Sequence, residues 1–269
     1  MTGEPMFPER GPWSDGASYE RYMGRWSRRV AREFIAWLGQ PAGLSWLDVG
    51  CGTGALTATI CAECAPGAIV AVDPSGPFID YARGTLRDNR VRFEVASASA
   101  LPVGDRSIDV VASGLALNFF ADRPAAFAEM QRVAKPNATI AFYVWDYPGG
   151  GMGFMDAFWE AAMAVAPGAA SAGERSRFPF CTPGGLLDEL RAAGFAQAEA
   201  RPIEVTAEFA DFDDLWAPFT QGTGPAPAYY QRLDGETRLA LKRTLESRVA
   251  GRRPIQFPAR AWALRGRPG

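Results

Sequence analysis

The sequence predicts an α/β fold in which a doubly wound, mostly parallel sheet of seven strands carries helices on both faces and lid insertions. Residues 46–58, reading WLDVGCGTGALTA, pass from an apolar strand through a glycine turn into a helix. Apolar strands then alternate with helical patterns as far as residue 146, and a pair of long strands closes the pattern. Two segments, 147–181 and 211–251, interrupt this alternation and are predicted as insertions.

The glycine turn is the first candidate ligand site. Gly50, Gly52 and Gly54 occupy alternate positions, so a ligand can approach the main chain, and the helix that follows directs N–H groups toward it. With Ala55 the turn also fits the GxGxx(G/A) pattern of dinucleotide-binding units, which keeps a nicotinamide-dependent oxidoreductase open as an alternative. Asp48 would face a pyrophosphate unfavourably but suits a ligand that carries an ammonium group.

The string LDVGCGTG resembles the first motif of the class I S-adenosylmethionine-dependent methyltransferases, in particular the small-molecule, type 11-like kind. The resemblance implies a Rossmann-like core that binds S-adenosyl-L-methionine. In that family the acidic residue and the glycine loop hold the methionine end of the cofactor. Here these positions are Asp48, Gly50, Cys51 and Gly52.

The next apolar strand, AIVAVDPS at residues 68–75, ends in an acidic residue. A carboxylate that closes the second strand is placed to accept both hydroxyls of a ribose, and the resemblance gives this role to Asp73. Pro74 and Phe78, at the start of a helix predicted over 77–87, are expected beside the cofactor.

A second signature follows the third strand, predicted over 91–95. LPVGDRSIDVV resembles the family run LP-x-x-D-x-S-F-D-V-V, which leads into the fourth strand at 108–112. By this alignment Ser97 stands where the family usually has an adenine-facing aspartate, so a hydroxyl replaces the carboxylate. Ala98 is expected to offer its backbone N–H to the adenine ring.

Ligands in open parallel sheets bind at the carboxyl ends of the strands. After a helix at 124–133, the fifth strand ends at residues 143–146, so residues 113–118 and 143–146 should border the pocket. Ser113, Gly114 and Asn118 complete the predicted cofactor-binding set. The predicted acceptor pocket is aromatic and consists of Tyr22, Trp26, Phe119, Trp145, Phe154 and Phe158.

The predicted organisation has four parts. Residues 1–40 form an N-terminal arm and cap helices, and 41–146 form the cofactor-binding core. Residues 147–181 form a lid whose glycine run suggests a hinge. Residues 182–269 complete the core, with two helices in the insertion at 211–251. By the resemblance, the last strand is antiparallel and lies between the fifth and the sixth.

The chain contains no histidine, the side chain most often used as a general base near neutral pH. Hydrolases built on Ser-His-Asp or Cys-His are therefore excluded. The remaining candidates for a base are Tyr19, Tyr22, Tyr143 and Asp146. None has a spacing that marks it as a base, so the sequence favours catalysis by proximity and desolvation.

The charge and composition of the chain indicate which kinds of binding partner to expect. A net charge of −2 and a pI near 5.4 give no basic footprint for nucleic acid. No apolar stretch is long enough to span a bilayer and the first residues lack a signal-peptide pattern, so a cytoplasmic protein is expected, away from membranes. Cys61 and Cys64 have metal-ligand spacing, but without histidine no metal site is predicted.

The expected activity is in-line methyl transfer to a small, partly hydrophobic metabolite by a monomer or homodimer. The acceptor atom is left open among O, N, C and S. A non-catalytic or regulatory S-adenosylmethionine-binding protein is the second hypothesis, and the oxidoreductase is the third.

Overall fold

The computed structural model describes residues 24–166, 168–169, 173–221 and 224–269. In this part of the chain, seven strands form one sheet in the order β3-β2-β1-β4-β5-β7-β6. Strands β1 to β5 are parallel, whereas β7 is antiparallel to both β5 and β6. The predicted fold class is confirmed, including the place of the last strand. The strands are β1 Ser45–Val49, β2 Ala68–Asp73, β3 Val91–Val95, β4 Ile108–Gly114, β5 Ala134–Trp145, β6 Ala196–Phe209 and β7 Ile255–Arg267.

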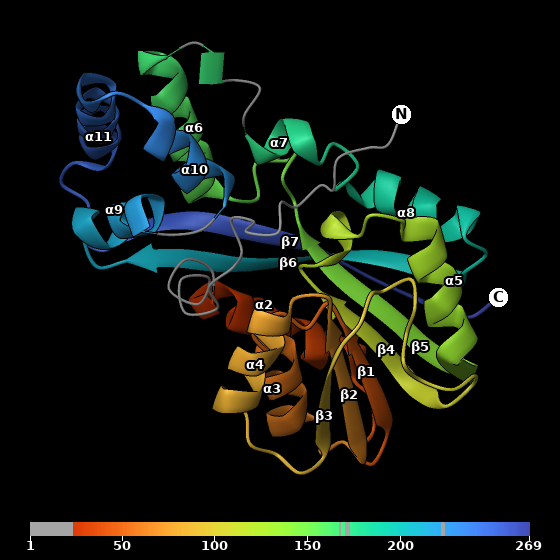
Figure 1. Cartoon of the computed structure of the whole chain (residues 1–269). Coiled ribbons are helices and arrows are strands. Elements are labelled where there is room, and N and C mark those ends of the chain that lie inside the picture. The colour runs from red at the N-terminus through yellow and green to blue at the C-terminus, as the bar shows by residue number, and fades with distance from the viewer. Residues whose placement is uncertain (1–23, 167, 170–172, 222–223) are drawn as a thin grey trace.

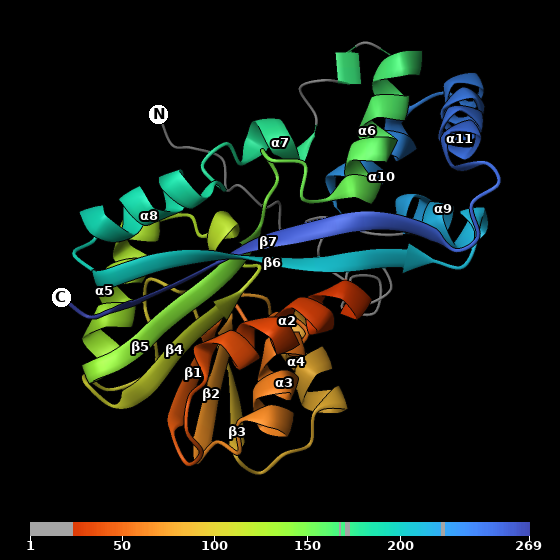
Figure 2. The same cartoon turned by 180° about the vertical axis from the view of Figure 1, so that it is seen from behind.

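Helices cover both faces of the sheet (Figures 1 and 2). One face carries α2 Arg25–Leu38, α3 Ala55–Glu63 and α4 Gly76–Thr85. The other carries α5 Arg123–Val133, α8 Pro183–Ala192 and the short 3-10 helix η2 Leu117–Phe119. Each of α4, α5 and α8 begins with a proline in its first turn after a capping Ser75, Asp122 or Thr182, whose side chain accepts a backbone N–H.

The strands contribute side chains to a hydrophobic core on each face of the sheet, because alternate side chains of a strand point to opposite faces. On β5, Tyr143 and Trp145 belong to the core under α2 and α3, while Phe142 and Val144 belong to the core under α5 and α8. Tyr143 is fully buried there, with its ring centroid 4.7 Å from that of Phe34 on α2. The carboxyl end of β5 is therefore packed on both sides.

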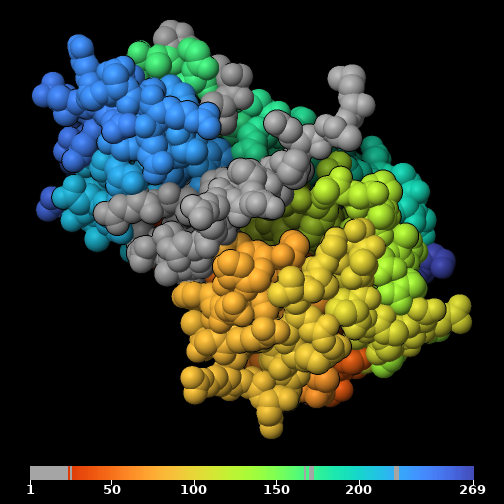
Figure 3. Space-filling view, in the orientation of Figure 1, coloured from red at the N-terminus to blue at the C-terminus, as the bar shows by residue number. Residues whose placement is uncertain are grey.

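Beyond the parallel strands, β6 and β7 continue as a long antiparallel pair that supports a helical layer (Figures 1 and 2). This layer consists of α6 Gly153–Val165, α9 Phe212–Gln221, α10 Pro225–Arg232 and α11 Gly235–Val249. In the space-filling view of Figure 3 these helices, in blue and green, form a lobe beside the orange and yellow residues of the core. The helices of the two predicted insertions thus pack together on the antiparallel pair β6 and β7.

The helical layer has an aromatic core of its own. Phe154 and Phe158 on α6 are fully buried, and Phe158 stacks on Phe219 of α9 with ring centroids 4.4 Å apart. Trp26 on α2 lies 4.9 Å from Phe154 and 5.0 Å from Phe209 on β6. Each such aromatic side chain buries a large apolar area. The helical layer is therefore packed against α2 as well as against β6 and β7.

The insertion at 211–251 differs from the prediction of two helices. Within the residues described, it contains three, because α10 forms in the Pro- and Gly-rich stretch that was predicted as a loop. Pro225 is the first residue of α10. The N–H groups in the first turn of a helix make no intrahelical hydrogen bond, so proline, which has no N–H, is tolerated there. A proline that begins a helix was mistaken for a proline that breaks one.

The glycine run after β5 is fixed to β7 by hydrogen bonds. Gly151 N–H donates to Asp146 O at 2.8 Å, and Arg260 N–H donates to Gly151 O at 2.7 Å. Gly149 N–H donates to Asp146 Oδ1 at 2.8 Å, and the Arg260 guanidinium pairs with Asp146 Oδ2 at 2.6 Å. A β-carbon on Gly151 would lie 2.6 Å from Arg260 O. These glycines allow close packing, which does not support the predicted hinge.

None of the helices in the described part of the chain is both long and apolar enough to cross a membrane.

The close contact between Gly151 and the backbone of Arg260 leads to a prediction for stability. Replacing Gly151 with Ala should destabilise the protein by about 1–3 kcal/mol, because the new methyl group must displace backbone atoms. Gly84→Ala in the last turn of α4 is the matched control: nothing lies within 4 Å of its added β-carbon. It should stabilise by about 0.5–1 kcal/mol, the usual gain for Ala over Gly in a helix. Urea denaturation of both variants measures the difference, and equal stabilities would contradict the tight packing at Gly151.

Candidate functional site

The loop after β1 is held by the end of β2. Gly50 and Cys51 donate their N–H groups to Val72 O at 2.8 and 2.9 Å. Gly52 N–H donates to Asp73 Oδ2 at 3.0 Å, and Ser75 N–H donates to Asp73 Oδ1 at 2.8 Å. The N–H groups of residues 50–52 are thus satisfied inside the protein, so a ligand must be held by other atoms of this loop and by its neighbours.

Two glycines of the loop have different reasons to be glycine. Both have positive φ, +74° at Gly50 and +53° at Gly52. A β-carbon on Gly50 would lie 2.5 Å from the β-carbon of Ala116, so this position is needed for packing against the segment after β4. A β-carbon on Gly52 would meet nothing within 4 Å. The open face of the loop is therefore at Gly52, where a ligand can approach.

Asp48 lies beneath the loop and is completely buried. Thr57 Oγ1 on α3 donates to its Oδ2 at 2.6 Å, whereas its Oδ1 has no hydrogen-bond partner in the structure as described. Burial raises the pKa of Asp48 to about 7, and the charge of Asp73 adds to the rise, against the lowering effect of the Thr57 hydrogen bond. The predicted ammonium partner would thus meet a carboxylate that no solvent reaches.

Asp73 is also mostly buried, and burial raises its pKa, opposed by the hydrogen bonds from Ser75 and Gly52. Each oxygen accepts one backbone N–H, which leaves each with a second lone pair. Those lone pairs fit the two hydroxyls of a ribose. Around Asp73, Pro74 is exposed and Phe78 is half-buried, while Cys51 is buried in a small core with Ile79 and Phe93.

Two predicted residues, Ser113 in β4 and Asn118 in η2, carry buried polar atoms without a partner among the described residues: Ser113 Oγ and Asn118 Nδ2. Buried polar groups are nearly always hydrogen-bonded, so each such atom calls for a ligand or a water. Gly114 lies against Tyr143, whose hydroxyl would be 2.6 Å from an added β-carbon. Three buried polar atoms on the predicted cofactor side of the sheet therefore lack a partner among the described residues. They are the carboxylate oxygen Asp48 Oδ1, the hydroxyl oxygen Ser113 Oγ and the amide nitrogen Asn118 Nδ2.

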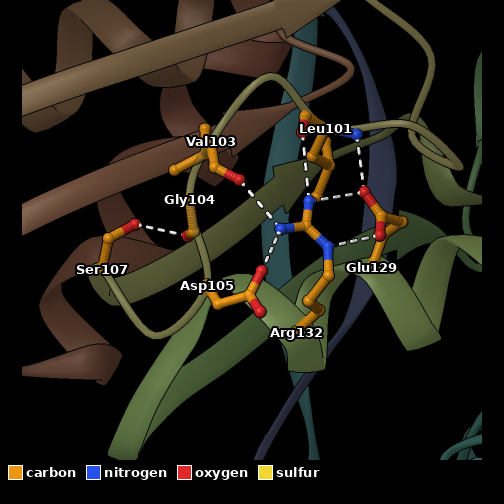
Figure 4. Close-up of polar contacts among 7 residues, drawn as sticks. All are labelled: Leu101, Val103, Gly104, Asp105, Ser107, Glu129 and Arg132. Atoms are coloured by element: carbon orange, nitrogen blue, oxygen red, sulfur yellow. Dashed lines mark hydrogen bonds and ion pairs between the residues drawn. The ribbon is translucent and has the colours of Figure 1, made fainter.

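The predicted adenine side is an exposed turn after β3. Ser97 is exposed and its hydroxyl lies 2.9 Å from that of Ser99, while Ala98 is half-buried. The following loop is fixed by Arg132 of α5 (Figure 4). Its guanidinium donates to Leu101 O and Val103 O at 3.1 and 3.0 Å. It also pairs with Asp105 and with Glu129, whose carboxylate in turn accepts the Leu101 N–H at 2.8 Å.

The predicted bases fall into two groups. Tyr19 and Tyr22 lie outside the described residues. Tyr143 is 1% exposed in the α2 core, and Asp146 is 2% exposed with both carboxylate oxygens engaged by Gly149 and Arg260. Tyr143 and Asp146 therefore both lie in buried, closely packed positions.

The predicted acceptor pocket also divides. Trp26, Trp145, Phe154 and Phe158 are buried in the core that α2 shares with the helical layer. Phe119 is half-buried and packs edge-on against Phe178, with centroids 5.4 Å apart. Tyr147 lies 5.2 Å from the same Phe178 ring. Phe178 is itself only 6% exposed, in the core under α5 and α8, while Tyr147 is half-buried against it.

Comparisons with known proteins bear on this arrangement. A family model described as "Methyltransferase domain" matches residues 47–142, from β1 into β5. Residues 47–142 form a class I methyltransferase domain. The cofactor of this class is S-adenosylmethionine, and the chemistry of the unsatisfied atoms fits it, because that molecule carries an ammonium donor, ribose hydroxyls and an adenine with both donors and acceptors. Among the described residues, no group of three or more His, Cys, Asp or Glu side chains could hold a metal ion.

Relatives differ in how much of this chain they match. A demethylmenaquinone methyltransferase from Roseiflexus sp. (strain RS-1) is 38% identical over 95 residues, which is 35% of this chain and 40% of that protein. The nocamycin O-methyltransferase of Saccharothrix syringae is 29% identical over 247 residues, covering 83% of this chain and 85% of its own length. A solved structure assigned to an antibiotic biosynthesis pathway of Anabaena variabilis has a TM-score of 0.61 at 19% identity, covering 87% of this chain and 96% of its own.

If the open face of Gly52 receives the cofactor, Gly52→Ala should weaken binding of S-adenosylmethionine at least about tenfold, equivalent to about 1.4 kcal/mol. Gly43→Ala is the matched control, because it also has positive φ and open space but lies in the turn before β1. Both variants should lose the roughly 1–2 kcal/mol of stability that a left-handed Ala costs. Calorimetric titration separates them, and equal affinities would place the cofactor elsewhere.

The buried Asp48 makes stability depend on pH. Its folded pKa of about 7 lies above the ordinary value of 3.8, so the folded protein holds a proton that the unfolded chain releases. Stability of the cofactor-free protein should then fall as pH rises from about 4 to about 7 and level off above.

Asp48→Asn removes that titration, so its melting temperature relative to wild type should rise between pH 4.5 and pH 8, by an amount corresponding to roughly 1–3 kcal/mol. Asp188→Asn, at an exposed carboxylate paired with Arg191, is the control and should show no such change. Parallel pH profiles for wild type and Asp48→Asn, followed by differential scanning fluorimetry, would contradict the burial of this charge.

Proposed function

We propose that this methyltransferase moves the sulfonium methyl group of S-adenosylmethionine to a hydroxyl oxygen of a small, partly hydrophobic metabolite. The observation that carries the choice of oxygen is the extent of the matches. The nocamycin O-methyltransferase matches 83% of the chain, which is more than the methyltransferase domain at residues 47–142 alone, whereas the demethylmenaquinone methyltransferase matches only 35%. The segments outside the domain are those that select an acceptor, so the longer match is the better guide to it.

Methyl transfer requires mainly that the protein position the acceptor against the methyl group and exclude water from the site. The acceptor oxygen must lie in line with the bond between the methyl carbon and the sulfur, and a preformed geometry contributes roughly 7–11 kcal/mol. On the acceptor side, Phe119, Tyr147 and Phe178 form an aromatic contact over the ends of β4 and β5. Such rings suit an apolar acceptor and a sulfonium cation, and they exclude water.

A second candidate is a protein that binds S-adenosylmethionine without transferring its methyl group. It is favoured by Ser97, a hydroxyl where the family has an aspartate and one that already pairs with Ser99. A neutral hydroxyl is a weaker acceptor than a carboxylate for the adenine amino group. Under this candidate the cofactor binds but no acceptor is modified.

The test uses S-adenosylmethionine with a labelled methyl group and a panel of small phenols, enolisable dicarbonyls, hydroquinones, amines and thiols. Transfer to the oxygen of at least one hydroxylated compound, found by mass spectrometry, is the expected result. Transfer to nitrogen or sulfur alone would contradict the choice of oxygen. Cofactor binding by calorimetry without any transfer would favour the non-catalytic candidate, and no binding would remove both.

A further inference from the structure

A buried carboxylate in the second half of the 147–181 segment has no part in the site described so far. Glu174 is the first residue of the short helix α7, Glu174–Arg177, and its side chain is only 5% exposed. Trp159 Nε1 on α6 donates to Glu174 Oε2 at 2.7 Å. The other oxygen, Oε1, is buried and has no hydrogen-bond partner among the described residues. Leaving such an oxygen unsatisfied is unfavourable, and more so when the group is charged.

The charges around Glu174 do not neutralise it. Burial raises its pKa to about 7, which the hydrogen bonds from the Glu174 backbone and Trp159 and the charge of Arg177 oppose, while Asp156 adds to the rise. Arg175 pairs with Asp156 at 3.3 Å. On the far side of Trp159 lies Tyr229 of α10, with ring centroids 5.3 Å apart. A carboxylate whose pKa is close to neutral pH can both accept and release a proton there.

The place of α7 relates Glu174 to the reaction site. Phe178 N–H donates to Glu174 O at 3.0 Å, so the two residues are one helical turn apart, roughly 5.4 Å along the axis. Phe178 contacts Phe119 beside Asn118 and Tyr147 after β5. In both cartoon views α7 lies between α6 and α8, above the point where β5 ends (Figures 1 and 2). The helix α7, which begins at Glu174, thus lies near the carboxyl end of β5, where open parallel sheets bind their ligands.

We propose that Glu174 binds the hydroxyl of the methyl acceptor and takes its proton. This rests on the proposed O-methyl transfer. Oε1 accepts the hydrogen bond of the acceptor hydroxyl, while Trp159 holds Oε2 in place. As the new O–CH₃ bond forms, the C–S bond breaks and its electron pair neutralises the sulfonium. The hydroxyl proton moves to the Glu174 carboxylate, and it passes to water when the methylated product leaves.

A purely structural role makes a different prediction. If Glu174 only ties α7 to α6, a glutamine serves as well, because its carbonyl oxygen still accepts the Trp159 N–H. If Glu174 takes a proton, a glutamine fails, because an amide is not a base at neutral pH. Glu160→Gln is the matched control: Glu160 lies on α6 beside Trp159, is exposed, and pairs with Arg248 at the surface.

With an acceptor from the panel, Glu174→Gln should lower kcat about a hundredfold or more, the lower range for loss of a general base. Its affinity for S-adenosylmethionine should stay near that of wild type, and its melting temperature relative to wild type should rise as pH rises to about 7, because the variant lacks the titration of the buried carboxyl group. The wild-type kcat should rise with pH through about 7, and this rise should disappear in the variant. Glu160→Gln should behave as wild type. A Glu174→Gln enzyme with kcat and pH profile unchanged overturns the proposal.

A binding measurement keeps this test independent of turnover. The probe is 7-hydroxycoumarin, a phenol whose fluorescence distinguishes its neutral and ionised forms, added to the protein with S-adenosylhomocysteine. Wild type and Glu160→Gln should bind it equally, and Glu174→Gln at least tenfold more weakly. Equal affinity in all three proteins, or no binding by wild type at millimolar probe, overturns the Glu174 site. If the probe binds as expected but no panel compound is methylated, the proposed transfer fails while the acceptor site stands.

Discussion

The structure depends above all on the two hydrogen bonds that the Asp73 carboxylate accepts from Gly52 and Ser75. They join the turn after β1 to the turn after β2, so one side chain fixes both loops of the predicted cofactor site. The bonds engage one lone pair on each oxygen and hold the carboxylate in a single orientation. A group already held before the ligand arrives loses little conformational freedom on binding. The same carboxylate thereby shapes the loop and remains able to receive a ligand.

Much of the core was predictable from sequence because its signals are local. AIVAVDPS contains the complete strand β2 and the residues that end it, and LDVGCGTG contains the end of β1 and the turn that follows; the parallel strands and the position of β7 agree with the expectation. Tyr143 and Asp146 were harder to interpret, since their position after a strand is shared by ligand-binding and buried residues. Only three-dimensional packing shows that Phe34 covers one and Arg260 neutralises the other.

The acceptor side was less predictable because its contacts join distant parts of the sequence. Phe119, Tyr147 and Phe178 come together from three loops, and no periodicity connects them. The aromatic residues of α6 have a clear helical pattern, but such a pattern cannot tell a pocket wall from a core. Glu174 sits in the polar string GERSR, which reads as solvent-exposed until the burial of its side chain is known. The sequence pattern therefore predicts individual residues for the cofactor side, whereas for the acceptor side it predicts only aromatic segments.

The position of β7 has a consequence for synthesis on the ribosome. In the sheet as described, β6 pairs only with β7, and β7 also completes the edge of β5. Until residues 255–267 have left the exit tunnel, the parallel strands must end at an open β5 edge, and β6 and the helices around it lack their central partner. An open strand edge is a template for pairing with other chains. The nascent protein therefore passes through a stage in which its first domain is nearly complete and its exposed edge needs protection from aggregation.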